Sequence, residues 1–217
     1  SSNYAKFSKV PMFEPADSQE ALEFTKLGFE ASEQFDTPIF LRSTTRISHS
    51  KSIVTLSERT QDIATPKLER NAAKLVMLPA NARKRHYAVE ERLQQMDEWA
   101  CSQPFNRIEK GAGKIGVITA GVSYQYVKEV LPDADVLKIG LVNPLPKQLI
   151  RDFAANNYET LYVVEELDPF IEDQVRAMGI EVVGKDKLPI CGELTPGRIQ
   201  KALFAKDSPT EDNSPEL

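Results

Sequence analysis

Apolar residues recur along the first 50 positions with the spacing of a helix and then of a strand. Residues 17–35 predict an amphipathic helix, because apolar side chains return to one face every three or four positions. That face consists of Phe24, Leu27, Ala31 and Phe35. Asp17 can cap the helix, with Glu20 three residues later. Residues 38–43, which follow, are typical of a short buried strand.

Short apolar runs alternate with amphipathic segments after the glycines at 111 and 113. Strands are predicted at 114–121, 134–142, 160–167 and 180–184, and helices at 123–131, 146–157, 168–179 and 195–205. The helices are opened by Ser123, Pro146, Asp168-Pro169 and Thr195-Pro196. Alternation at this spacing requires parallel strands joined by right-handed crossovers, which predicts an α/β fold with a doubly wound parallel sheet.

The region between these two parts is less regular. Residues 50–84 carry weak periodicity, two prolines and a basic run at 81–85, so they are interpreted as a connection. A helix is predicted at 86–101, with its apolar face packed on the following domain. Residues 206–217 are polar, acidic and rich in Pro and Ser, and a disordered linker is expected there.

Composition excludes several classes of protein. The net charge is -5 and the pI is about 5.3, so the electrostatic footprint of sequence-independent nucleic-acid binding is missing. No apolar run approaches the roughly 20 residues that span a bilayer, and the first residues lack the apolar core of a secretion signal. A cytoplasmic protein without nucleic-acid or membrane partners is therefore expected.

The two cysteines, Cys101 and Cys191, lie too far apart in sequence for a zinc, iron-sulfur or redox motif. Two unpaired structural thiols are expected. The chain also begins without Met and enters a folded-looking pattern almost at once, which suggests a fragment of a longer protein.

Ligands of an open parallel sheet bind where the strands end, because the loops and helix N-termini meet there. Three segments reach this edge, at 119–123, 143–146 and 165–168. The residues expected to contact an anion or a neighbouring domain are Gly121, Ser123, Asn143, Glu165, Glu166 and Asp168. A tight turn is favoured over a phosphate cradle at Gly121. For the carboxylates, an ion pair or hydrogen bond to a neighbouring domain is favoured over Mg²⁺, with one glutamate facing inward.

A second candidate segment follows the strand predicted at 38–43. Arg42, Arg46 and His49, with four hydroxyl residues among them, could hold a carboxylate or phosphate. A domain interface uses the same groups, and that interpretation is favoured. His86, at the start of a helix, is expected to be a surface residue. No nucleophile elbow, HExxH motif or Ser/His/Asp constellation is suggested by spacing.

Several runs resemble a known family. They are residues 3–50, then PANARKRHYAVEERL, GVITAGVSYQYVKEVLPDADVLKIGLVNPLP and LYVVEELDPFIEDQV. Together they are similar to the large subunit of indolepyruvate:ferredoxin oxidoreductases, and the last two resemble the domain of 2-oxoacid:ferredoxin oxidoreductases that is like the transketolase C-terminal domain. The resemblance covers nearly the whole chain.

The resemblance implies a domain order. Residues 1–50 would be the C-terminal end of a thiamine diphosphate pyrimidine-binding α/β domain, 51–112 a connection with a helix, and 113–205 the transketolase C-terminal-like domain. The linker at 206–217 would lead to a pyrophosphate-binding domain. Arg42, Arg46 and His49 then lie on the thiamine-domain side and are candidates for the active-site side.

The implied activity is oxidative decarboxylation of arylpyruvates to aryl-acetyl-CoA, with electrons passed to ferredoxin. The complete enzyme would use thiamine diphosphate, Mg²⁺, 4Fe-4S clusters and CoA, and would pair with a small subunit. The activating glutamate, the GDG-type Mg²⁺ motif and the cluster cysteines are absent from this sequence, so no catalytic residue is assigned and no cofactor or metal is expected on the fragment. It would supply scaffold that docks the other domains of the same subunit.

Two alternatives stay open. One is a segment of a pyruvate or other 2-oxoacid ferredoxin oxidoreductase, and the other is a non-catalytic α/β module that binds an anion or a partner around Gly121 and Glu165. Residues 1–50 are expected to be poorly supported, because part of an α/β domain lacks the strands on which its apolar face packs.

Overall fold

The computed structural model describes residues 2–58 and 69–204. The predicted linker at 206–217, and residues 59–68 of the predicted connection, lie outside this part of the chain. The helices are α1 Ser2–Ser8, α2 Ser18–Phe35, α3 Thr45–His49, α4 Ala72–Leu75, α5 Pro79–Ala100, α6 Gly121–Val130, α7 Lys147–Ala154, α8 Phe170–Ala177 and α9 Pro196–Phe204. The strands are β1 Met12–Phe13, β2 Phe40–Leu41, β3 Arg107–Glu109, β4 Ile115–Ala120, β5 Asp135–Ile139, β6 Leu141–Asn143 and β7 Thr160–Val164.

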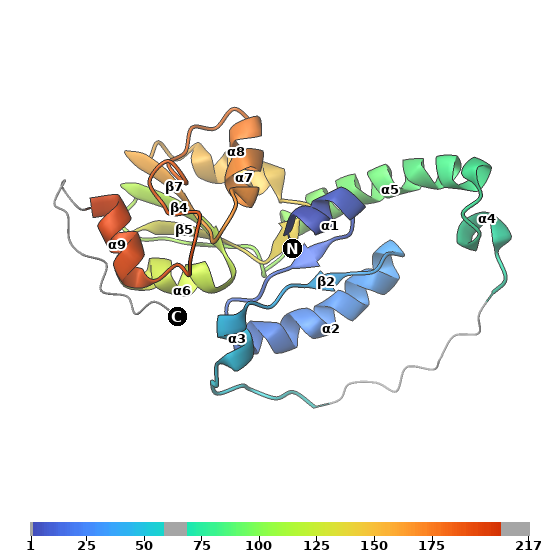
Figure 1. The fold of residues 1–217 in the computed structure, drawn as a ribbon, viewed down its shortest axis with the longest axis horizontal. Coiled ribbons are helices and arrows are strands. Elements are labelled where there is room, and N and C mark those ends of the chain that lie inside the picture. The colour runs from blue at the N-terminus through green and yellow to red at the C-terminus, as the bar shows by residue number, and fades with distance from the viewer. Residues whose placement is uncertain (1, 59–68, 205–217) are drawn as a thin grey trace.

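The larger sheet has the strand order β3-β5-β4-β7. Strand β4 is parallel to both β5 and β7, whereas β3 is antiparallel to β5. Helices α7 and α8 cover one face and α6 and α9 the other (Figure 1). The α/β class with a parallel sheet is thus confirmed.

Strand periodicity explains why both faces of this sheet are buried. Ile118, Leu137 and Val163 face the α7 and α8 side with Phe153 and Val175, and their neighbours in sequence point the other way. Those neighbours, Val117, Val136 and Val164, pack with residues of α6 and α9. A parallel sheet covered on both faces reads as continuous apolar runs, which is what the sequence contains.

A second, smaller sheet has the order β2-β1-β6. Strand β1 is parallel to β2 and antiparallel to β6. Beside it a separate core forms from Phe13, Phe24, Ala100, Phe105 and Leu141. Residues 1–50 are therefore better supported than expected, because β6 and the segment around Phe105 supply part of the apolar surface on which β1 and α2 pack.

The single strand predicted at 134–142 is wrong, because the chain changes sheets at Gly140. Strand β5 ends at Ile139 in the large sheet, and β6 begins at Leu141 in the small one. The Asn106 side-chain oxygen accepts the backbone N–H of Gly140 at 2.7 Å, and the Gly140 carbonyl accepts from Glu14 N at 2.9 Å. Gly140 is thus the single residue that connects the large sheet to the small one.

A side chain at position 140 is expected to destabilise this junction. An alanine Cβ would lie 2.7 Å from the Phe105 carbonyl oxygen and 2.9 Å from Phe24 Cζ, and the backbone atom cannot move aside. Gly140→Ala should lower the free energy of unfolding by about 1–3 kcal/mol, the usual cost of overpacking. Urea unfolding would measure it, with Gly197→Ala as control, since nothing lies within 4 Å of a Cβ there. Equal stability of the two variants would contradict the expectation.

Other predictions need correction. The strand predicted at 38–43 is shorter in the structure, where β2 contains only Phe40 and Leu41. These two side chains are 43% and 41% exposed rather than buried. No strand forms at 180–184, where Val183 makes only an isolated bridge to Tyr162. Helix α6 begins at Gly121, so Ser123 lies inside its first turn rather than opening it.

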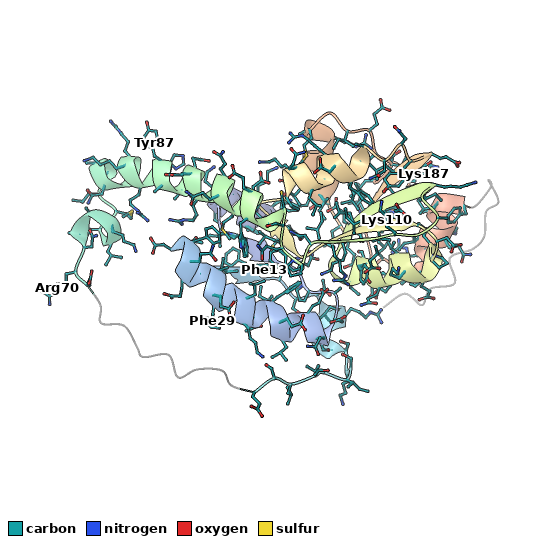
Figure 2. All side chains as sticks on the ribbon, turned by 180° about the vertical axis from the view of Figure 1, so that it is seen from behind. Phe13, Phe29, Arg70, Tyr87, Lys110 and Lys187 are labelled. Carbon is teal, nitrogen blue, oxygen red and sulfur yellow. The ribbon has the colours of Figure 1, made fainter. Side chains whose placement is uncertain are left out.

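The helix predicted at 86–101 begins earlier, at Pro79. Its C-terminal half packs as expected, with Met96 and Ala100 fully buried. The N-terminal half projects with α4 from the rest of the molecule (Figure 1). Figure 2 shows Tyr87 on α5 and Phe29 on α2 pointing outward, in contrast to Phe13 in the interior. Of the described helices, none is long and apolar enough to cross a membrane.

Candidate functional site

A large concavity in the described part of the chain lies where the ends of β2 and β7 meet. Its volume is about 800 Å³. Arg42, Arg46, His49 and Glu166, which the sequence singled out separately, all line it. The remaining wall consists of Ser43, Thr44, Thr45, Ser50, Leu167, Gly192 and Glu193. We call this the guanidinium pocket.

Backbone geometry explains why Arg42 and Arg46 lie at this edge. The Arg42 N–H donates to the Phe13 carbonyl, which extends the β2–β1 pairing past the strand, and Nη1 of Arg42 contacts Glu14 Oε1 at 2.5 Å. The side chains of this pair are only 17% and 11% exposed. Thr44 then caps the short helix α3, which carries Arg46 and His49. Arg42 is thus held firmly.

The opposite wall is a loop whose backbone is held by Arg198. Its Nη1 donates to the Glu193 carbonyl at 2.7 Å and its Nη2 to the Cys191 carbonyl at 3.1 Å. The loop places the Glu193 side chain against Arg46, with both Nε and Nη2 of Arg46 directed at Oε1, at 2.7 and 2.5 Å. The favoured interface role of Arg46 is consistent with this contact across 147 positions of sequence.

A smaller cavity of about 50 Å³ adjoins the pocket and is rich in carboxylates. Glu14, Ser123, Glu165, Glu166 and Asp168 line it together with Arg42. Gly121 has a φ of 54°, and a Cβ there would lie 2.5 Å from Glu14 Oε1. The glycine turn therefore accommodates a carboxylate of the protein itself, a neighbour that disfavours a bound phosphate.

Glu165 faces inward, as expected of one of the two adjacent glutamates. Its carboxylate accepts the backbone N–H of Ile171 at 2.9 Å and of Glu172 at 2.9 Å, at the start of α8. The helix that follows Glu165 in the chain thus supplies these donors, and a further bond to a neighbouring domain stays a prediction. Burial raises the pKa of Glu165 to about 7, although these two N–H groups and Lys185 oppose the rise.

The other predicted contact residues, Asn143, Glu166 and Asp168, have different surroundings. Asn143 Nδ2 donates to the Val10 carbonyl at 2.8 Å and thereby joins β6 to the N-terminal segment. Glu166 accepts from Leu194 N at 3.2 Å. Asp168 is exposed at the rim of the small cavity.

The described residues contain no group of three or more His, Cys, Asp or Glu side chains placed to hold a metal ion. Glu172 is buried against Arg176 Nε at 2.9 Å and the Lys185 N–H at 2.8 Å. Cys101 and Cys191 are free thiols, and His86 is a surface residue as predicted, 62% exposed beside Glu90.

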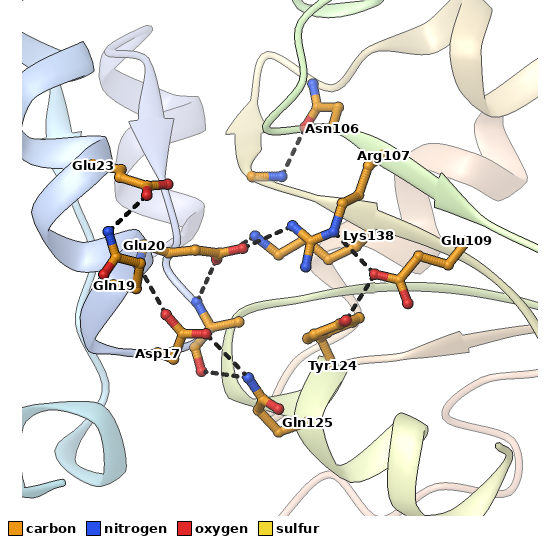
Figure 3. Close-up of polar contacts among 12 residues, drawn as sticks. Asp17, Gln19, Glu20, Glu23, Asn106, Arg107, Glu109, Tyr124, Gln125 and Lys138 are labelled. Atoms are coloured by element: carbon orange, nitrogen blue, oxygen red, sulfur yellow. Dashed lines mark hydrogen bonds and ion pairs between the residues drawn. The ribbon is translucent and has the colours of Figure 1, made fainter. Parts of the chain in front are cut away.

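A buried ionic network was missed by the sequence interpretation (Figure 3). Lys138 of β5 has a fully buried side chain that pairs with Glu20 of α2 and lies 4.8 Å from the centre of the Phe24 ring. Glu20 also accepts from Arg107 Nη1 at 2.9 Å and from the Ala16 N–H at 2.8 Å. A lysine inside an apolar strand pattern was the available signal, because an unpaired buried charge is not tolerated.

The network continues to helix α6. Arg107 Nε donates to Glu109 Oε1 at 2.9 Å, and the Tyr124 hydroxyl donates to the same oxygen at 2.7 Å. Burial raises the pKa of Glu109, but Tyr124, Lys128 and Arg107 outweigh it and bring the pKa down to about 2. Figure 3 shows that the chain of contacts runs from α2 to the large sheet, so it fixes the two parts of the molecule together.

Chemically, the guanidinium pocket offers cationic and hydroxyl donors on one wall and carboxylate acceptors on the other. This arrangement can bind and orient a polar ligand.

Comparison with known proteins gives consistent matches. The chain is 39% identical to the indolepyruvate oxidoreductase subunit IorA of Archaeoglobus fulgidus over 94% of its own length, and 38% identical to that of Thermococcus kodakarensis over 92%. It spans about a third of the length of these relatives, 35% and 33%. No family model matches the chain.

A solved structure shares the fold. The 2-oxoglutarate:ferredoxin oxidoreductase of Magnetococcus marinus, determined with 2-oxoglutarate, coenzyme A and succinyl-CoA bound, superposes with a TM-score of 0.61. The two sequences are 16% identical, and the match covers 88% of this chain and 41% of that one. At this identity the likeness concerns the fold.

Proposed function

This chain is related to indolepyruvate oxidoreductase subunits named IorA over more than nine tenths of its own length, and on that basis we propose that it is one segment of a thiamine diphosphate-dependent 2-oxoacid:ferredoxin oxidoreductase. The complete enzyme would decarboxylate indolepyruvate oxidatively to an aryl-acetyl-CoA and pass the electrons to ferredoxin. The identity of 39% over 94% of the chain carries this proposal.

The segment's own role would be scaffolding. Residues 1–50 would close the pyrimidine-binding domain, 51–112 connect, 113–205 form the transketolase C-terminal-like domain and 206–217 lead onward. The charged network around Glu20 and Lys138 supports this, because it joins the first and third of these regions through buried contacts. Partners would be the remaining domains of the same subunit, the small subunit and ferredoxin.

The complete enzyme would require thiamine diphosphate, Mg²⁺, 4Fe-4S clusters and CoA. The donor sets described above fit neither the metal nor a cluster, so we propose no reaction step on this chain through these groups. Arylpyruvates arise by deamination of aromatic amino acids, which would place the enzyme in amino-acid catabolism. A cytoplasmic location is part of the same proposal.

The direct test is turnover by a full-length subunit that contains this segment, assembled with its small subunit. Thiamine diphosphate, CoA and an artificial electron acceptor would be supplied, and indolepyruvate compared with pyruvate and 2-oxoglutarate. Acceptor reduction with the highest kcat/KM for indolepyruvate is the expected result. A preference for pyruvate or 2-oxoglutarate would reassign the substrate, and no turnover with any of the three would contradict the proposal.

A graft tests the scaffold role separately. This chain would replace the matching third of the Archaeoglobus fulgidus subunit, and the graft would be compared with one that carries Glu20→Ala. We expect the first graft to reduce the acceptor with indolepyruvate and the second to assemble poorly. A well-folded but inactive first graft would show that the segment does more than support the other domains.

A further inference from the structure

The guanidinium pocket has the construction of a ligand site. Its volume of about 800 Å³ falls within the 300–1,000 Å³ usual for small-molecule sites. Three stretches distant in sequence, 42–50, 166–167 and 192–193, converge to form it. It is also far larger than a lone phosphate or carboxylate needs, so a ligand that fills it carries a further group of atoms.

Its cationic wall combines one guanidinium that is held in a part-buried ion pair with one whose carboxylate partner can be exchanged. Arg42 is part-buried and anchored by Glu14. Arg46 is 54% exposed and Glu193 46% exposed, and an ion pair open to water to this extent contributes little stability. Both donors of Arg46 converge on one oxygen of Glu193 rather than on two. A guanidinium fork is matched better by two oxygens of the same oxyanion.

A tyrosine hydroxyl is buried near this wall. Tyr126 Oη is shielded from solvent, and Tyr126 and Arg46 shift each other's pKa. Burial raises the pKa of Tyr126. The carboxylates of Glu166 and Glu193 add to this rise, and the Arg46 guanidinium opposes it. These three pocket residues therefore all interact electrostatically with Tyr126.

The Glu193 side chain can move away from Arg46 without a change in the backbone of the pocket wall. Arg198 holds the backbone of the loop through the carbonyl oxygens of Cys191 and Glu193, so the Glu193 side chain can turn away while the loop stays in place. Glu166 is partly engaged by the Leu194 N–H and remains to accept a hydroxyl or amine of the ligand.

We propose that the guanidinium pocket binds a small polar metabolite through a phosphate or carboxylate group, which displaces Glu193 from Arg46. Arg42 supplies the second positive charge and His49 a further donor at the rim. Residues of this chain alone form the site, and binding of a ligand there would be a function in addition to the scaffold role proposed above.

Titration of the chain with inorganic phosphate, pyrophosphate and acetate at constant ionic strength tests this, with binding followed by amide chemical shifts and calorimetry. The shifts should concentrate at residues 42–50 and 190–194. Arg46→Ala should weaken binding about tenfold, the cost of a charge-assisted hydrogen bond. Glu193→Gln should tighten it about threefold, because the competing carboxylate is removed.

The opposite signs expected for Arg46 and Glu193 separate a ligand site from damage to the fold. Lys74→Ala is the matched control, since Lys74 pairs with Asp36 on the surface outside the pocket, and it should leave affinity unchanged. Tighter binding of phosphate or pyrophosphate than acetate would identify a phosphate ligand, and the reverse a carboxylate. No binding of any probe, weaker binding by Glu193→Gln, or equal losses in Arg46→Ala and Lys74→Ala would overturn the proposal.

Discussion

Replacing Glu20 by alanine is expected to destabilise the protein by about 3–5 kcal/mol, because a buried ion pair that loses one partner leaves an uncompensated charge. The Lys138 side chain has no exposure to solvent, and Glu20 is its carboxylate partner (Figure 3). Burial pushes the pKa of Glu20 upward, but Lys138, the Ala16 N–H and Arg107 outweigh it and leave the pKa below the usual value. Glu20 is therefore ionised, and among the described residues it is the carboxylate that forms an ion pair with Lys138.

Paired variants make the expectation specific. The double variant Glu20→Leu with Lys138→Met removes both charges and should be clearly more stable than Glu20→Ala, because apolar residues can replace a buried pair at little cost. Arg107→Ala is the control: Arg107 bonds the same glutamate but is 39% exposed, and its loss should cost less. Urea unfolding of all variants measures the differences. A loss below about 1 kcal/mol for Glu20→Ala would show that the pair is not buried as described.

The stability of the protein is expected to fall as the pH rises from 5 to 8, and Glu165 should account for about 2–3 kcal/mol of that change. Its folded-state pKa is about 7, whereas the unfolded carboxyl titrates near 4.5. The folded state thus binds more protons than the unfolded state between these values. The contribution is fully present below pH 4.5 and is lost as the pH rises through 7, because ionised Glu165 is poorly solvated in its buried position.

Glu165→Gln isolates this contribution, since the amide oxygen can still accept from the N-terminus of α8 but cannot ionise. The unfolding free energy changes between pH 5 and pH 8, and this change should be about 2–3 kcal/mol smaller in the variant than in the parent protein. Glu129→Gln, on the exposed face of α6, is the control and should keep the parent pH dependence. Identical pH dependence in the parent and Glu165→Gln would place the folded-state pKa of Glu165 near its ordinary value.

Much of the fold could be predicted because its signals are local. The Asp17 cap of α2 forms as expected, with the Asp17 carboxylate accepting from Glu20 N at 2.8 Å. The strands β4, β5 and β7 lie where continuous apolar runs predicted them. At Gly140 the prediction failed, because a change from one sheet to another leaves no interruption in hydrophobicity, and only the close approach of Phe105 and Phe24 reveals why glycine is required.

The candidate site was predictable in its parts. Arg42, Arg46, His49 and Glu166 were identified separately, since polar residues after a strand fall at the edge where strands end. Glu193 carried no such signal. It reaches the pocket only because the tertiary fold brings the loop before α9 to α3, where Glu193 pairs with Arg46.

The sequence by itself determined the fold class, the Asp17 cap of α2, the relationship to its homologues and the strand-end position of the candidate residues, because period and spacing are properties of the chain. The tertiary structure alone decided which charges meet. Glu20 finds Lys138 across 118 positions and Arg46 finds Glu193 across 147. Such pairs depend on how sheets and helices are placed in space, and electrostatic energy depends on that distance and on burial rather than on separation in sequence.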